Sequence, residues 1–443
     1  MIEIWAVGGY SEIGSKNMTA VKVDDEVIIM DMGYNVEKIV NYEGREGEEI
    51  TKLSYKQMLK MDAVPNDTQL KEEWGEKVKA IVIGHGHLDH CGAVRLLAKR
   101  YKQAPIIATP FTLEIINKGL EGKKLYNKTI ALNPSSKYKI SNKITIELIN
   151  MTHSTLQTVA IAIHTPYGAV LYTNDFKLDN TPVLGKKPDY EALKKVGENC
   201  IAQISDCTTV DKGGHTPSET LAKEMLKDIL LRYQNRDNGI IVTTFSSHIP
   251  RLSSLLKLAE QIGREPVFIG RSLFNYLEAA KNTNLFSTNA KIAGFVRQRI
   301  KLLSQINKNR EKYMIICTGN QGEPNAILSR IVNDETPYRM QDDDVVIFSC
   351  KVIPTPTSVA NREILERKLK GKNIRIFKDV HVSGHASKAD HRELLQILKP
   401  KHFIPTHGGM DKLVVAAEIA RTMGYQLNEN VHLLQDGKKL VIQ

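Results

Sequence analysis

The chain has 443 residues, of which 42% are hydrophobic and 25% charged, and its formal net charge is +11. These values are typical of a folded globular protein with two or three domains. No apolar run approaches the roughly 20 residues that cross a bilayer, and the N-terminal residues lack the basic region of a signal peptide. The basic excess favours a polyanionic partner.

The five cysteines are scattered along the chain and form no CxxC pair. This spacing argues against a disulfide framework and against a thiolate metal site. Reduced thiols are typical of the cytosol, so the sequence predicts a cytoplasmic protein with no membrane segment.

The first elements in the chain are short strands. Residues 2–9 and 18–33 alternate like paired strands around a loop rich in Gly and Ser. Residues 41–77 are highly charged and predict a surface excursion with short helices and no assigned chemistry. Residues 78–84 predict a strand, residues 92–101 a helix, and residues 104–110, 144–154 and 167–175 further strands.

The pattern of predicted strands and helices changes after Asp206. Residues 239–270 predict strand, helix and strand, which is the unit of a parallel sheet, and residues 313–331 repeat strand, loop and helix. Residues 343–350 and 373–377 add two strands. The sequence thus predicts an α/β protein in which one domain interrupts another. The outer domain covers 1–207 and 379–443, and the inserted domain covers 208–378.

Residues 84–94 have the sequence GHGHLDHCGAV, in which several potential metal-ligating side chains directly follow an apolar strand. Positions i and i+2 of an extended chain point the same way, so His85 and His87 can bind one ion together. Asp89 and His90 lie where the chain turns toward a helix, and they can reach a second ion nearby. This arrangement is typical of two-metal hydrolases.

Four more polar residues each follow an apolar strand, where loops gather into a site. They are Asp31, His153, Asp175 and His407. Nitrogen and oxygen ligands suit zinc, and manganese is an alternative. Together these residues complete, in chain order, the ligand set of the metallo-β-lactamase fold, which the outer domain resembles.

The resemblance implies an αββα sandwich and two divalent metal ions, most simply Zn²⁺. By this resemblance His85, His87 and His153 hold the first ion, while Asp89, His90 and His407 hold the second. Asp175 bridges the two ions. Asp31 orients ligands without binding metal. The implied reaction is hydrolysis by a water that the ions activate.

The position of the insertion resembles the β-CASP group of nucleases, whose inserted domain has a mainly parallel sheet. Its marker positions match Asp206, His381 and His407. In that group the histidine matched by His381 protonates the leaving oxygen or stabilises the transition state, a task that suits a histidine near neutral pH.

Further blocks narrow the resemblance to the ribonuclease J family, in its short, archaeal-type form. These blocks are GGYSEIGSKNM from Gly8, TTFSSHIPR, TGNQGEP and HVSGHAS. Two departures stand out. The family's usual HGE reads HGG here, with Gly409 in place of the acid, and residues 350–363 differ from the bacterial pattern.

Two Ser-rich turns precede predicted helices and suggest a phosphate pocket. Ser246, Ser247 and His248 stand before one helix, and Ser383, Gly384, His385 and Ala386 stand before another. Helix N-termini bind phosphate through free N–H groups. Plain helix capping is the alternative from the residues alone, but the resemblance implies a site for a 5′ monophosphate.

The expected function is therefore that of a two-metal ribonuclease acting on single-stranded RNA in decay and processing. It removes nucleotides 5′ to 3′ with a preference for a 5′ monophosphate, and endonucleolytic cutting is left open. A DNA-processing β-CASP nuclease, a small-molecule metallo-hydrolase and a non-catalytic RNA-binding protein are the alternatives. By family analogy we expect a homodimer or higher homo-oligomer.

Overall fold

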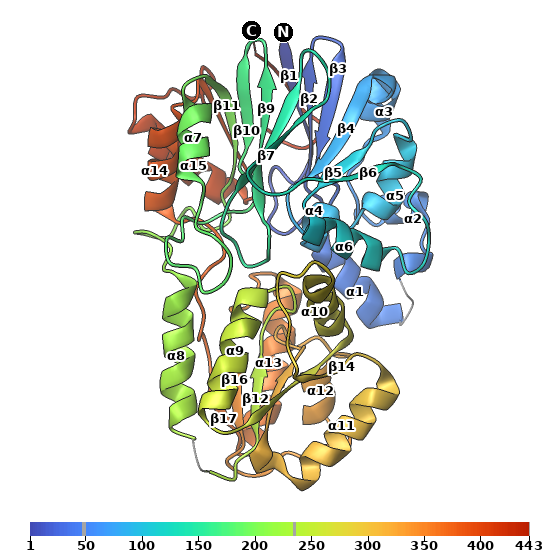
Figure 1. The fold of residues 1–443 in the computed structure, drawn as a ribbon, viewed down its shortest axis with the longest axis vertical. Helices are drawn as coiled ribbons and strands as arrows, with labels where there is room; N and C mark the ends of the chain where they lie inside the picture. The colour runs from blue at the N-terminus through green and yellow to red at the C-terminus, as the bar shows by residue number, and fades with distance from the viewer. Residues whose placement is uncertain (47–49, 234–235, 443) are drawn as a thin grey trace.

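The computed structural model describes residues 1–46, 50–233 and 236–442 as two lobes joined by a narrow waist (Figure 1). Both termini lie at the far end of the upper lobe, where β19 (Lys439–Ile442) pairs antiparallel with β1 (Ile2–Gly8). None of the helices in the described ranges combines the length and apolarity needed to span a bilayer.

The upper lobe contains two mixed sheets. The first has the order β19-β1-β2-β3-β4-β5-β6, and the second has the order β18-β11-β10-β9-β8-β7. The remaining strands of the first sheet are β2 (Met18–Val23), β3 (Glu26–Met30), β4 (Val78–Ile83), β5 (Ile106–Ala108) and β6 (Thr129–Ala131). The second contains β7 (Ser136–Lys139), β8 (Thr145–Asn150), β9 (Val159–Thr165), β10 (Gly168–Tyr172), β11 (Cys200–Asp206) and β18 (His402–Thr406).

An apolar core joins the two sheets face to face. Ile4 and Ile28 from the first sheet pack in one buried cluster with Ile146, Ile161 and Ile204 from the second. Helices cover the outer faces and complete the expected αββα sandwich. They are α1 (Val36–Glu46), α2 (Tyr55–Lys60), α3 (Thr68–Trp74), α4 (Leu88–Cys91), α5 (Val94–Leu97) and α6 (Pro110–Gly119) beside the first sheet, and α7 (Tyr190–Gly197), α14 (Lys388–Leu398) and α15 (Met410–Arg421) beside the second.

The lower lobe contains a third sheet, in which every strand pairing is parallel, with the order β14-β13-β15-β12-β16-β17. Its strands are β12 (Ile240–Thr243), β13 (Glu265–Ile269), β14 (Lys291–Ala293), β15 (Tyr313–Cys317), β16 (Val345–Phe348) and β17 (Arg375–Phe377). The helices are α8 (Glu219–Leu231), α9 (Ile249–Gln261), α10 (Arg271–Asn282), α11 (Val296–Lys308), α12 (Ile327–Val332) and α13 (Pro356–Gly371).

The direction of the third sheet matters for function. Helix α8 carries the chain down to the far end of the lower lobe, so the parallel strands run back toward the sandwich (Figure 1). Their carboxyl ends and following loops therefore face the upper lobe. In parallel α/β sheets this is the edge where ligands bind.

Local structure differs from expectation at the helix predicted for residues 92–101. The structure has α4 and α5 there, followed by a 3₁₀ turn at Ala98–Arg100. Helix α4 already begins at Leu88, inside the histidine motif, and Gly92 separates the two pieces. A Cβ at Gly92 would lie 2.3 Å from the Tyr34 ring, so this close approach requires glycine. The expected short helices of residues 41–77 are present, although residues 47–49 lie outside the described residues.

A buried arginine ties the lobes together at the waist. The Arg251 guanidinium is fully buried and donates to both carboxylate oxygens of Glu219, where α8 begins. It also donates to the carbonyl oxygens of Ser349 (2.9 Å) and Val380 (3.2 Å). One side chain thus contacts the outgoing strand-to-helix connection, the end of β16 and the returning chain.

We predict that Arg251→Met lowers the free energy of unfolding by about 3–5 kcal/mol, because the substitution leaves the Glu219 carboxylate buried without its cation. Urea denaturation measures the change. The control is Arg232→Met, which removes an exposed arginine 2.6 Å from Asp228 and should cost about 0–1 kcal/mol. Equal losses for the two variants would contradict this account of the waist.

Candidate metal centre

Each candidate ligand follows a strand of the sandwich, and the strand ends bring the ligands together. His85 follows β4, His153 follows β8, Asp175 follows β10, and His407 follows β18. The backbone turns sharply at several of these points. Asp31 (φ 61°), Asn174 (φ 58°) and His407 (φ 56°) adopt the left-handed region, which costs free energy and occurs preferentially at functional sites.

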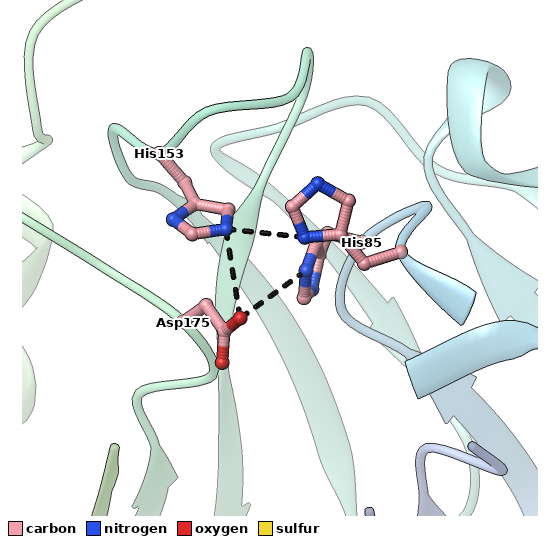
Figure 2. A group of neighbouring side chains, drawn as sticks. His85, His153 and Asp175 are labelled. Atoms are coloured by element: carbon pink, nitrogen blue, oxygen red, sulfur yellow. Dashed lines mark hydrogen bonds and ion pairs between the residues drawn. The ribbon is translucent and has the colours of Figure 1, made fainter. Parts of the chain in front are cut away.

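The first group of ligands is His85, His87, His153 and Asp175, whose ligand atoms lie within 4.8 Å of one another. Figure 2 shows the Asp175 carboxylate between the His85 and His153 rings. Its Oδ2 lies 3.5 Å from Nε2 of each histidine. His153 Nε2 also lies 3.2 Å from His87 Nδ1, so the side chains of this group converge on one point.

The second group is Asp89, His90, Asp175 and His407, again with all ligand atoms within 4.8 Å. Here the other Asp175 oxygen, Oδ1, lies 3.1 Å from His90 Nε2 and 3.5 Å from His407 Nε2. The structure thus assembles the two ligand sets that the sequence predicts, and Asp175 belongs to both.

Burial sets the protonation of the first group. Burial, reinforced by neighbouring histidines, lowers the pKa of His85 well below its ordinary value. Burial likewise lowers the pKa values of His87 and His153 to about 3. All three imidazoles are therefore neutral at pH 7, which is the form that coordinates a metal.

Metal ions fit these groups because the buried polar atoms lack other partners. Within the described residues, Nε2 of His85 in the first group and Oδ1 of Asp175 in the second are buried without a hydrogen bond. Orphaned buried polar atoms are costly. A cation in each ligand group would satisfy the orphaned atom of that group, and a mixed nitrogen and oxygen donor set suits divalent zinc or manganese.

Neighbouring groups hold the ligands in place. The Asp31 carboxylate pairs with His90 Nδ1 at 2.7 Å and accepts a hydrogen bond from the Gly84 amide. Nδ1 of His85 pairs with Asn174 Oδ1 at 3.0 Å. Each contact leaves Nε2 of the histidine facing the centre. Asp31 matches its expected orienting role, whereas Asn174 was not anticipated, although its place before Asp175 at a strand end was the available signal.

Gly384 orients a ligand from the returning chain. Its carbonyl oxygen accepts a hydrogen bond from His153 Nδ1 at 2.7 Å, and a Cβ at this position would lie 3.0 Å from the imidazole ring. The segment expected to bind phosphate therefore also contacts the metal centre.

A third group places His385 at the centre. Asp175, Asp206 and His385 offer ligand atoms within 4.8 Å, and His385 Nδ1 lies 2.8 Å from Asp206 Oδ2. Burial disfavours the charged imidazole, but Asp206 and Asp175 outweigh it and raise the pKa of His385 to about 9. Asp206, in turn, has a lowered pKa because His385 outweighs the effect of its burial.

His381, which the family pattern matched to a marker position as it did Asp206, lies away from this group. Its electrostatic neighbours are Arg251, His248 and Glu219 at the waist. Burial and the Arg251 charge lower the pKa of His381 to about 2. The two histidines are four residues apart in one motif, and the turn before α14 aims the second of them at Asp206. The structure therefore puts His385 where His381 was expected.

The remaining predicted phosphate ligands occupy two different environments. Ser246 and Ser247 are half-buried at the carboxyl end of β12, while His248 is buried with Nε2 3.4 Å from Glu219. The Ser383 hydroxyl accepts a hydrogen bond from the His385 amide, and Ala386 packs in the outer core of the second sheet. At the HGG departure, Gly409 caps α15, and a Cβ there would lie 2.5 Å from the Asp411 carboxylate.

Comparison with protein families agrees with this architecture. Residues 12–228 match the metallo-beta-lactamase superfamily, residues 237–366 the beta-CASP domain of ribonuclease J, and residues 372–433 a Zn-dependent metallo-hydrolase RNA specificity domain. The fold and site thus define a metallo-β-lactamase hydrolase with an inserted β-CASP domain.

Similarity to individual proteins identifies the family within this superfamily. The chain is 45% identical to ribonuclease J of Methanocaldococcus jannaschii over 99% of its own length and 98% of the relative's. It is 40% identical to ribonuclease J of Pyrococcus abyssi over 99% and 96%. This chain belongs to the ribonuclease J family. A crystal structure of an Enterococcus faecalis protein of unknown function shares the fold, with a TM-score of 0.68 at 16% identity and full coverage of both chains.

Proposed function

We propose that this chain, a metal-dependent ribonuclease, binds two divalent ions and removes nucleotides from the 5′ end of single-stranded RNA. The observation that carries the two-metal proposal is the Asp175 carboxylate, whose two oxygens face two separate ligand groups. Divalent ions held there would activate a water and neutralise charge on a phosphodiester. Zinc is the proposed ion, with manganese as the alternative.

The chain's own residues contribute positioning and proton transfer. Asp175, His85 and His90 are fixed by strand ends and by Asn174 and Asp31, so their geometry is set before substrate binds. His385, charged and hydrogen-bonded to Asp206, is the candidate that protonates the departing 3′ oxygen. We therefore assign to His385 the role that the family pattern suggested for His381.

The 5′-end preference is proposed from the Ser-rich turns. Ser247 is half-buried at the carboxyl edge of the third sheet, and no side-chain hydrogen bond of its hydroxyl occurs within the described residues. His381 and His248 are electrostatic neighbours, so the turn after β12 and the returning chain approach each other at the waist. A phosphate held between them would place the RNA terminus beside the metal centre and favour stepwise removal.

We also propose a cellular compartment and an oligomeric state for this chain. The five cysteines are free and buried, which fits a reducing, cytoplasmic setting. Met410 and Val414, one turn apart on α15, are exposed apolar residues, which supports a homodimer formed through the C-terminal segment. Processing of DNA is the second candidate function, because discrimination depends on contacts to the 2′-hydroxyl.

The substrate proposal is tested by incubating the enzyme, in zinc or in manganese, with single-stranded RNA and DNA that carry a 5′ monophosphate, triphosphate or hydroxyl. We expect mononucleotides to be released preferentially from monophosphorylated RNA. Ser247→Ala removes a hydrogen bond to a charged group, worth about 1.5–3 kcal/mol, and should reduce the preference about 10- to 100-fold. Ser54→Ala, at an exposed helix cap, is the control. Equal internal cutting whatever the 5′ end would refute the phosphate pocket.

Kinetic measurements on variants distinguish the roles of the two histidines in the HVSGHAS motif. We expect His385→Ala to lower kcat by about 10²- to 10⁴-fold, as loss of a general acid does, while bound metal is retained. His381→Ala should affect kcat less, because this side chain lies at the waist. Single-turnover hydrolysis and metal analysis of both variants give the comparison. A larger loss of kcat from His381→Ala, with metal retained, would return the role to His381.

A further inference from the structure

Three arginines gather on the lower lobe outside the metal centre. Arg271 begins α10, Arg299 lies in α11, and Arg330 lies in α12. Phe295, the residue before α11, lies one helical turn before Arg299. We call this surface the arginine platform. None of its residues belongs to the metal ligands or to the expected phosphate pocket.

A ring contact brings the helices of two of the arginines together. Phe274 lies one turn after Arg271 on α10, Phe295 lies one turn before Arg299, and the two rings are in contact. Besides partial burial, the charges that act on Arg299 are those of Arg330 and Arg271, and they lower its pKa. No carboxylate in the described residues lies within ion-pair distance of Arg299. Arg271 and Arg330 have one distant partner each, Glu121 and Glu335, both at 3.5 Å. Like charges held together in this way favour the binding of an anion.

An aromatic pair, in which Phe295 is exposed and Phe274 half-buried, lies one helical turn from Arg299 and Arg271. Phe295 is 55% exposed, and its ring centroid lies 5.3 Å from that of Phe274 at an interplanar angle of 60°. Gly294 permits this packing, since a Cβ there would lie 2.7 Å from Phe274. Cationic side chains beside an open aromatic face are the two components with which proteins bind single-stranded nucleic acid.

The platform is connected to the proposed RNA site. Ser272, next to Arg271, shares a hydrogen bond of 2.7 Å with Ser246 of the expected phosphate turn. Further along α10, the Tyr276 hydroxyl donates to the Gly86 carbonyl oxygen at 2.8 Å, between the metal-binding residues His85 and His87. Helix α10 lies at the junction of the lobes, and α11 lies on the outer side of the lower lobe (Figure 1). RNA that follows α10 away from the metal centre would therefore reach the arginines.

We propose that the arginine platform is a second RNA-binding surface, which contacts phosphates and a base of single-stranded RNA outside the nucleotides next to the cut. The proposal rests on the proposed function in that RNA is the substrate, but it requires neither the 5′ polarity nor the monophosphate pocket. The competing occupant is a second copy of the chain docked on Phe295, Val296 and Ile300, which are all exposed. Three arginines facing another molecule of net charge +11 disfavour it.

The test compares a long and a short substrate of the metal-loaded enzyme. Arg299→Ala and the triple variant with Arg271→Ala and Arg330→Ala are assayed on a 5′-phosphorylated 20-nucleotide RNA and on a 5′-phosphorylated trinucleotide. For the triple variant we expect kcat/KM on the long RNA to fall at least about tenfold, with little change on the trinucleotide. Arg421→Ala, an exposed arginine of α15 paired with Glu418, is the charge-matched control and should change neither value.

Salt dependence and direct binding complete the test. Each lost phosphate contact should reduce the slope of log affinity against log salt by about 0.7, hence by about 2 for the triple variant. Fluorescence anisotropy of the labelled 20-nucleotide RNA in excess chelator measures this slope without any cleavage. Failure of the exonuclease proposal would therefore leave this readout intact. An unchanged slope, an equal loss on the trinucleotide, or a change of oligomeric state in the triple variant without weaker RNA binding would each overturn the proposal.

Discussion

The structure depends on keeping a set of polar side chains buried together at one edge of the sandwich. His85, His90 and Asp175 have almost no exposed surface, and within the described residues His85 Nε2 and Asp175 Oδ1 have no hydrogen-bond partner. Such an arrangement is unfavourable without compensation, because buried polar groups lose their hydrogen bonds to water. Divalent cations supply that compensation. The two sheets fix the geometry because they hold each ligand at a strand end, where loops meet and the backbone adopts left-handed turns.

The supporting contacts explain why distant segments belong to one centre. Asp31 from the first sheet fixes His90, while Gly384 from the returning chain fixes His153. The lower lobe is held at the waist by Arg251, which contacts both of the segments that cross between the lobes. The β-CASP insertion is thus joined to the sandwich by specific buried contacts, which fix its carboxyl edge relative to the candidate metal centre.

The residues that gather in the candidate metal centre could be singled out from the sequence because each carries a short-range signal. The motif HxHxDH follows one strand, and single polar residues follow four others. To predict that they meet, only the rule that loops at one sheet edge converge was needed. The αββα sandwich and the parallel insert followed from the same patterns together with the family resemblance. The role of His381 stays a prediction. The motif holds two histidines, and only the turn before α14 determines that His385 is the one that reaches Asp206. Arg251 and the arginine platform were not predicted, since their partners are far apart in sequence and carry no local pattern.

The central claim is that Asp175 joins two metal sites, and metal stoichiometry tests it most directly. Protein stripped with chelator, reloaded with zinc and passed through a desalting column is analysed by mass spectrometry. We expect about two ions per wild-type chain, about one in His153→Ala and in His407→Ala, and near-complete loss in Asp175→Ala. Asp62→Ala, at a half-exposed carboxylate outside the centre, should retain both. A single ion in the wild type, or two ions retained by Asp175→Ala, would contradict the account.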